Sequence, residues 1–139
     1  MPKLVTRFAP SPTGYIHVGN IRAALFPYLL SAKANGTMIL RIEDTDRARF
    51  VEGATQLIVD SLKWVGIEWN EGYLVGGDHG PYEQSQRKEI YLKYARQLIE
   101  QGKAYADPYT PEEIEDFRKQ AINKKVPFLY RNYRPENPP

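Results

Sequence analysis

The chain has 139 residues, 42% of them hydrophobic and 26% charged, so it is long enough for one domain with its own core and is typical of globular proteins rather than of membrane spans. Its net charge of +2 is too small to indicate nucleic-acid binding by itself, and the absence of cysteine excludes disulfides and thiolate metal sites. With only two histidines we predict no metal site, and because no secretory or membrane segment stands out we predict a cytoplasmic protein.

The chain opens with a predicted strand, turn and helix. Residues 3–8 read as a short, mostly buried strand. The prolines and glycine of residues 9–16 then force a turn. Apolar residues at helical spacing predict a helix over about 19–34, which an Asn-Gly pair ends. Pro27 lies inside this helix and predicts a kink or a break, because it removes one backbone donor.

A second strand and helix follow. Residues 37–42 are predicted to form a strand that ends in an acidic cluster, and residues 54–65 an amphipathic helix. Strand, helix, strand and helix within about 65 residues predict an α/β fold. The residues expected to face inward from the second helix are Leu57, Ile58, Ser61, Leu62 and Val65.

The remaining elements are predicted as helices and connections. A glycine-rich connection over 72–81 precedes a long helix over 82–102. The run Thr-Pro-Glu-Glu from residue 110 is a capping box that should begin a helix ending near residue 123. Residues 127–139 contain four prolines and are expected to be extended or disordered.

Residues 117–139 carry six basic side chains and one acidic one. They lie beside Phe128, Tyr130 and Tyr133, so the segment could meet a phosphate backbone and stack on bases. A solvated tail explains the same composition equally well.

The segment 7–20 places a histidine at the mouth of a helix after a strand and a Pro/Gly turn. The first N–H groups of a helix have no partner within the helix and attract anions, and Gly14 and Gly19 allow a ligand to approach the backbone. His17 could add a donor, although a lone histidine here is more often a cap or a surface residue. Neither a P-loop nor a GxGxxG pattern occurs.

Segment 7–20 resembles the first signature of class I aminoacyl-tRNA synthetases, the His-Ile-Gly-His type, which stands here as His-Val-Gly-Asn at 17–20. The preceding Arg-Phe-Ala-Pro-Ser-Pro-Thr-Gly is the form seen in glutamyl-tRNA synthetases. Arg-Ile-Glu-Asp-Thr-Asp at 41–46 resembles that family's second landmark, and 79–87 resembles its Gly-Pro-Tyr-x-Gln-Ser segment. The resemblance runs in register over about 3–117, and the chain matches neither motif of the glutaminyl relatives.

The resemblance implies an α/β fold: the first half of a Rossmann-like class I synthetase nucleotide-binding domain over 1–79, and the beginning of the connective tRNA acceptor-binding insert over 80–139. An extended, basic, Pro-rich tail is expected from about residue 125. The second half of the sheet, the Lys-Met-Ser-Lys-Ser loop and the anticodon-binding helices have no counterpart in the sequence. We therefore expect this chain alone to be inactive.

By resemblance, the whole protein is a glutamate–tRNA ligase that uses ATP with Mg²⁺ to form glutamyl-adenylate and then charges tRNA(Glu), as a monomer. The zinc-binding cysteines of some relatives are replaced at 104–109, so no zinc is expected. Two alternatives stay open. One is a shortened paralogue that transfers glutamate to a modified tRNA nucleoside, and the other is a non-catalytic RNA-binding module.

The resemblance also assigns site residues. It implies that the ATP phosphates are held at the helix mouth, where Asn20 supplies an amide without charge in place of the second histidine. It implies that Arg7 binds a carboxylate of glutamate and Glu43 its ammonium group. Asp44 and Asp46 could instead pair with neighbouring arginines. The implied residues are His17, Gly19 and Asn20 for catalysis and ATP, and Arg7, Ala9, Ser11 and Glu43 for glutamate. Beyond the stretch that the resemblance covers, the basic residues Lys124, Lys125, Arg131 and Arg134 are candidates for contacts with the tRNA acceptor stem.

Overall fold

The computed structural model describes residues 3–135, which fall into two compact units, Met1–Glu89 and Ile90–Pro139. The motif-based boundary after residue 79 lies ten residues earlier. The boundary between the compact units follows residue 89 because residues 82–85 are hydrogen-bonded to the segment after the second strand and so belong to the first unit. The assignment of the second unit to an acceptor-binding insert stays a prediction.

The first unit is built on a parallel sheet with the order β1-β2-β3, formed by Val5–Phe8, Thr37–Leu40 and Glu71–Gly72. The register pairs Arg7 with Ile39. The α/β class predicted from the sequence is confirmed. The two-residue strand β3 was not predicted, because so short a strand has no measurable periodicity.

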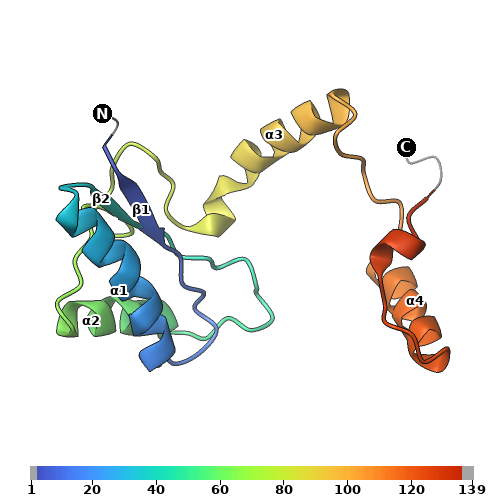
Figure 1. Cartoon of the computed structure of the whole chain (residues 1–139), viewed down its shortest axis with the longest axis horizontal. Helices are drawn as coiled ribbons and strands as arrows, with labels where there is room; N and C mark the ends of the chain where they lie inside the picture. Colours follow the sequence, from blue (N-terminus) through green and yellow to red (C-terminus); the bar gives the residue numbers. More distant parts are fainter. Residues whose placement is uncertain (1–2, 136–139) are drawn as a thin grey trace. The chain divides into compact units, whose positions relative to one another are not determined.

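Two helices, α1 (Val18–Lys33) and α2 (Ala54–Trp64), lie next to β1 and β2 (Figure 1). Phe8 of β1 and alternate residues of β2 point into the core that these helices share. Val5 and Arg7 lie on the other face and are exposed, so the expectation of a mostly buried first strand is wrong. Strand alternation buries only one face here. The core consists of Phe8, Ala24, Met38, Leu40, Ile42, Ile58, Val59, Leu62, Ile67 and Trp69.

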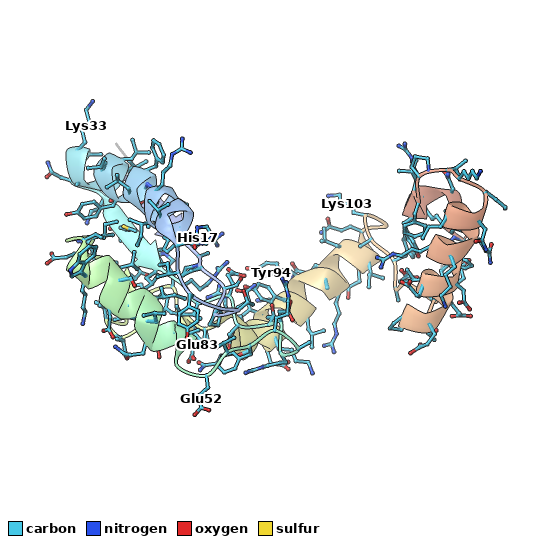
Figure 2. The ribbon with its side chains drawn as sticks, turned by 90° about the horizontal axis from the view of Figure 1, so that it is seen from below. His17, Lys33, Glu52, Glu83, Tyr94 and Lys103 are labelled. Carbon is cyan, nitrogen blue, oxygen red and sulfur yellow. The ribbon has the colours of Figure 1, made fainter. Side chains whose placement is uncertain are left out.

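Helix α1 runs through Pro27 without interruption, so the predicted break is absent. Figure 2 shows His17 and Lys33 at its opposite ends. A proline removes a single backbone donor, and the helix remains attached to β1 by Thr6, whose Oγ1 donates to the Pro27 carbonyl at 2.9 Å. Tertiary contacts outweigh the local penalty.

The inward face of α2 differs from the prediction at its end. The helix ends at Trp64, and Val65 is its exposed C-cap rather than a core residue. Leu57 and Ser61 are only half-buried. The residues that the helix does bury are Ala54, Ile58, Val59 and Leu62.

Beyond β2 the chain continues as an extended segment, residues 41–43. On one side the amides of Arg41 and Glu43 donate to the carbonyls of Phe8 (3.1 Å) and Pro10 (2.8 Å). On the other side the Ile42 amide donates to the carbonyl of Tyr82 at 2.9 Å. All three motif segments recognised in the sequence therefore meet at the carboxyl end of the sheet.

Residues 82–102 do not form one helix. A 3₁₀ turn, η1 (Gln84–Arg87), precedes α3 (Lys88–Glu100). Helix α3 buries none of its residues, and four of its apolar side chains, Tyr91, Tyr94, Leu98 and Ile99, are exposed in the described part of the chain.

The predicted capping box is present at the start of α4 (Pro111–Asn123), where Thr110 and Glu113 each accept from the other's backbone N–H. The extended tail expected over 127–139 is interrupted in the described part. Residues 130–132 form the 3₁₀ turn η2 (Tyr130–Asn132), and Tyr133 stacks on Phe117 with ring centroids 4.7 Å apart. Aromatic contacts fold this segment back onto α4, while residues 136–139 lie outside the described part. None of the described helices is long and apolar enough to span a membrane.

Candidate functional site

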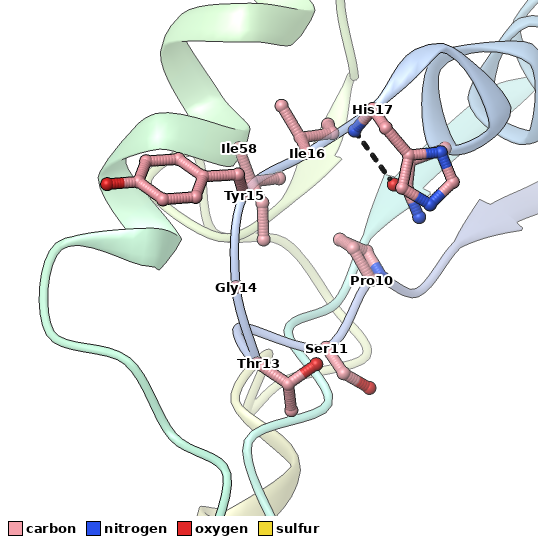
Figure 3. Close-up of a pocket in the computed structure, with 9 residues that line it drawn as sticks. Pro10, Ser11, Thr13, Gly14, Tyr15, Ile16, His17 and Ile58 are labelled. Atoms are coloured by element: carbon pink, nitrogen blue, oxygen red, sulfur yellow. Dashed lines mark hydrogen bonds between the residues drawn. The ribbon is translucent and has the colours of Figure 1, made fainter.

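His17 is the N-cap of α1. Its Nδ1 accepts from the Gly19 N–H at 3.1 Å, and Asn20 Oδ1 accepts from the His17 N–H at 3.0 Å (Figure 3). An imidazole nitrogen that accepts carries no proton, so the neutral ring has its proton on Nε2. The same side chain can therefore cap the helix and present an N–H donor to an anion.

The amides of the first helical turn are partly occupied. The Gly19 N–H is bonded to His17, and the Asn20 N–H donates to the His17 carbonyl at 2.9 Å. A Cβ at Gly19 would lie 2.8 Å from His17 Cε1, so only glycine leaves the cap undisturbed. Glycine is therefore needed at this position to leave room for the capping imidazole, as well as to let a ligand approach the backbone.

A pocket of about 220 Å³ lies at this helix mouth, between the turn after β1 and α2. It brings together Ser11, His17 and Asn20, three of the residues predicted from the sequence. Figure 3 shows the Tyr15 ring directed away from the imidazole, and that ring is 88% exposed. The lining residues are Pro10, Ser11, Thr13, Gly14, Tyr15, Ile16, His17, Asn20 and Ile58.

Arg7 lies in a different cavity, of about 370 Å³, on the face of the sheet that the helices leave open. Within residues 3–135 its guanidinium makes no hydrogen bond or ion pair, so its charge is available to an anion. Ala9 directly follows β1 and is not among the lining residues of either cavity. The cavity is lined by Val5, Thr6, Arg7, Ile39, Arg41, His79, Tyr82 and Arg87.

Glu43 does not pair with the arginines that follow it in sequence. It accepts from the Arg41 side chain at 2.9 and 3.1 Å, and both side chains are largely covered, with 15% of Arg41 and 25% of Glu43 exposed. Asp46 does pair with Arg49, at 2.6 Å, as the alternative interpretation of the acidic cluster expected. Glu43 is thus held beside the cavity of Arg7, which Arg41 also lines.

Asp44 holds the start of η1. Its carboxylate accepts from the Ser85 amide at 2.8 Å and from the Ser85 hydroxyl. Burial raises the pKa of Asp44, but the hydrogen bonds from Ser85 and the charge of Arg47 outweigh it, so the pKa lies below its ordinary value. Asp44 is therefore a structural residue that connects two of the motifs.

A cluster of side chains around the buried Glu71 was not predicted from the sequence. Glu71 Oε1 accepts from the Tyr82 hydroxyl at 2.6 Å and contacts His79 Nδ1 at 2.7 Å. The hydrogen bond from Tyr82 lowers the pKa of Glu71 despite its burial, so the carboxylate is ionised and His79 Nδ1 carries the proton. His79 belongs to a recognised motif, but no spacing rule pointed to Glu71 as its partner.

The basic residues proposed for tRNA lie in the second unit. Lys124 and Lys125 follow α4, and Arg131 lies in η2, all with exposed side chains. The Arg134 guanidinium lies over the ring of Tyr105, 4.9 Å from its centroid. Over residues 3–135 no group of three or more acidic or histidine side chains could hold a metal ion.

The family model for the catalytic domain of class I tRNA synthetases (E and Q) matches residues 3–136 of the chain. Among solved structures, a glutamate–tRNA synthetase from Elizabethkingia anophelis superposes with a TM-score of 0.86 at 41% identity, covering 93% of this chain and 26% of that one. A glutamate–tRNA ligase from Elizabethkingia meningosepticum, solved in complex with its amino acid, gives the same values.

Curated relatives agree. The glutamate–tRNA ligase of Lactobacillus delbrueckii subsp. bulgaricus is 54% identical over 118 residues, which are 85% of this chain and 24% of that protein. The ligase of a Sulfurihydrogenibium species is 52% identical over 134 residues, 94% of this chain and 28% of that protein. The chain thus spans about a quarter of the length of these relatives.

Proposed function

Because the chain belongs to the catalytic-domain family of class I tRNA synthetases (E and Q), we propose that it is part of a glutamate–tRNA ligase and supplies one side of that enzyme's substrate site. The substrates are glutamate, ATP with Mg²⁺, and tRNA(Glu). The proposal needs no zinc and places a monomeric enzyme in the cytoplasm.

The reaction has two steps. The α-carboxylate of glutamate attacks the α-phosphate of ATP, forming glutamyl-adenylate and releasing pyrophosphate, and the glutamyl group then passes to the terminal ribose of the tRNA. Both partners of the first step are anions, so the protein's contribution is positioning and the stabilisation of negative charge. No protein nucleophile is required.

The pocket at the mouth of α1 suits the phosphates of ATP. His17 Nε2 offers a donor while Nδ1 stays bonded to Gly19, and Asn20 keeps its amide NH₂ free of the capping bond. The positive end of the α1 dipole adds to the attraction. Gly19 acts by leaving room for the imidazole.

The cavity of Arg7 suits the amino acid. Arg7 has no carboxylate partner in the described chain, so its fork of N–H donors is available to bind a substrate carboxylate. Glu43, held by Arg41, supplies the negative charge that the substrate ammonium requires, while Ser11 lines the phosphate pocket and Ala9 lies between Arg7 and Ser11 in the sequence. The observation that carries the proposal is an unpaired Arg7 in a cavity that is also lined by Arg41, the ion-pair partner of Glu43.

In the second unit, the exposed Lys124, Lys125 and Arg131 suit the phosphates of the tRNA acceptor stem. Arg134 combines a charge with the ring of Tyr105, an arrangement that suits a phosphate beside a base. Single substitutions of these residues to alanine should weaken tRNA binding and reduce its dependence on salt concentration. The rate of adenylate formation should stay unchanged, because the proposed adenylate site lies in the first unit.

The test uses a complete enzyme that carries this segment, made by exchanging it into a related ligase, and measures glutamate-dependent pyrophosphate exchange with tRNA present. If Arg7 binds the side-chain carboxylate, glutamine leaves its charge unpaired, at a penalty of roughly 3–5 kcal/mol. Wild type should then prefer glutamate by about two to four orders of magnitude in kcat/KM. In Arg7→Ala this ratio should collapse.

Arg22→Ala, on the exposed side of α1, is the matched control and should keep the wild-type ratio. A preserved ratio with both activities lowered in Arg7→Ala would show that Arg7 holds the α-carboxylate, which both amino acids share. An enzyme with no exchange activity at all would leave the RNA-binding module as the better explanation.

A further inference from the structure

The loop from β3 to η1 is anchored on Glu71. Glu71 Oε1 accepts three hydrogen bonds, from the Tyr82 hydroxyl (2.6 Å), the His79 amide (3.0 Å) and His79 Nδ1 (2.7 Å). The packing around the carboxylate is tight, because a Cβ at Gly77 would overlap Glu71 Cγ. Glu71 itself is 8% exposed, so solvent competes little for these bonds.

The far part of the loop is anchored as well. Arg87 Nη1 donates to the carbonyls of His79 at 2.9 Å and Pro81 at 2.7 Å. The bonds from Ser85 to Asp44 attach the start of η1 to the segment after β2. The loop therefore has a defined shape although it contains no helix or strand.

Three side chains, His79 and Tyr82 of this anchored loop and Arg87 of η1, line the cavity that also contains Arg7 and Arg41. They make up the loop's share of the cavity wall, and the other lining residues are Arg41 and residues of β1 and β2. Glu71 does not line the cavity, yet two of the side chains that do are hydrogen-bonded to it.

Resting on the proposed function, we propose that Glu71 and Tyr82 are positioning residues for the amino acid: they hold the loop as the second wall of the glutamate pocket. The wall adds the Arg87 guanidinium to a cavity that Arg7 and Arg41 also line, and these cations complement a dicarboxylate substrate. Substitutions that release the wall should weaken glutamate binding and leave the pocket at the mouth of α1 unchanged, because the two pockets share no lining residue.

The test compares Tyr82→Phe and Glu71→Gln in the complete enzyme described above. Both variants keep the shape of the side chain. Tyr82→Phe removes one hydrogen bond to the Glu71 carboxylate, and Glu71→Gln removes the charge of that carboxylate. Losing one bond to a charged group should raise KM for glutamate about tenfold, with KM for ATP and kcat within about twofold of wild type. Tyr73→Phe is the matched control, since Tyr73 packs on the core and does not line the cavity.

A second measurement uses the 139-residue chain itself. L-Glutamate is titrated into the labelled chain, and the NMR shifts of the His79 and Tyr82 rings are followed. Wild type and Tyr73→Phe should show saturable shifts, and Tyr82→Phe and Glu71→Gln should need about tenfold more glutamate.

An unchanged KM for glutamate in both variants would overturn the proposal, as would a parallel change in kcat and both KM values, which is what general destabilisation produces. A wild-type enzyme with no glutamate-dependent exchange would instead overturn the proposed function. The titration tests the loop independently of enzyme activity. If glutamate does not shift the NMR signals of the His79 and Tyr82 rings in the wild-type chain, the proposed role of the loop is overturned as well.

Discussion

At the scale of single residues, His17 combines two roles that the sequence presented as alternatives. Its Nδ1 caps α1 through Gly19, as a simple structural histidine would, and this leaves Nε2–H as a donor toward the pocket. The cap is a fact of the structure, and the contact with ATP is part of the proposal. A substitution that keeps one role and removes the other can separate them.

Asparagine is among the best N-cap residues and alanine among the poor ones. We expect His17→Asn to retain the stability of the chain in urea unfolding, and His17→Ala to lose about 1 kcal/mol. Both variants should lower pyrophosphate exchange in the complete enzyme by about 10²–10³-fold, the usual value of one electrostatic donor. Wild-type exchange in His17→Asn would mean that His17 is a cap and nothing more.

At the scale of elements, the bond between Asp44 and Ser85 attaches η1 to the segment after β2. The pKa of Asp44 is lower in the folded chain than its ordinary value of 3.8, so the unfolded chain binds the proton more tightly. The stabilisation by this carboxylate is fully present above about pH 4 and is lost as the pH falls through the lower, folded value.

Asp44→Asn should therefore destabilise the chain at pH 7, and its difference from wild type should shrink toward pH 3. The measurement is the free energy of unfolding in urea at several pH values. Asp78→Asn, an exposed aspartate without a hydrogen bond in the described chain, should match wild type throughout. A difference for Asp44→Asn that does not vary with pH would contradict the assignment of the stabilisation to the ionised carboxylate.

At the scale of the whole molecule, each pocket is open to solvent and lined from one side of the sheet. The pocket at the mouth of α1 has a volume of about 220 Å³, below the roughly 300–1,000 Å³ usual for sites that enclose a small molecule. We expect the 139-residue chain to bind ATP with a dissociation constant of about 1 mM or weaker, which is at most about 4 kcal/mol of binding free energy. Calorimetry measures this directly, and micromolar binding would show that the pocket is complete without further protein.

The sequence determined what depends on neighbours along the chain. The periodicity of residues 18–33, the capping box at Thr110 and the three motifs each report a local pattern, and the structure contains both helices where they were expected. The motifs also indicated the family, because their residue sequences and their order along the chain are specific to it. By contrast, no spacing of residues along the sequence predicted that the site residues would be divided between two pockets.

Only the tertiary structure decided which side chains meet. Glu71 is eight residues from His79 and eleven from Tyr82, and Asp44 is 41 residues from Ser85. Such pairings depend on where parallel strands end and on which face of a strand points to the helices, not on propensity. The same physics corrected the expectations for β1, Pro27 and the tail, where packing against a neighbouring element outweighed the local pattern.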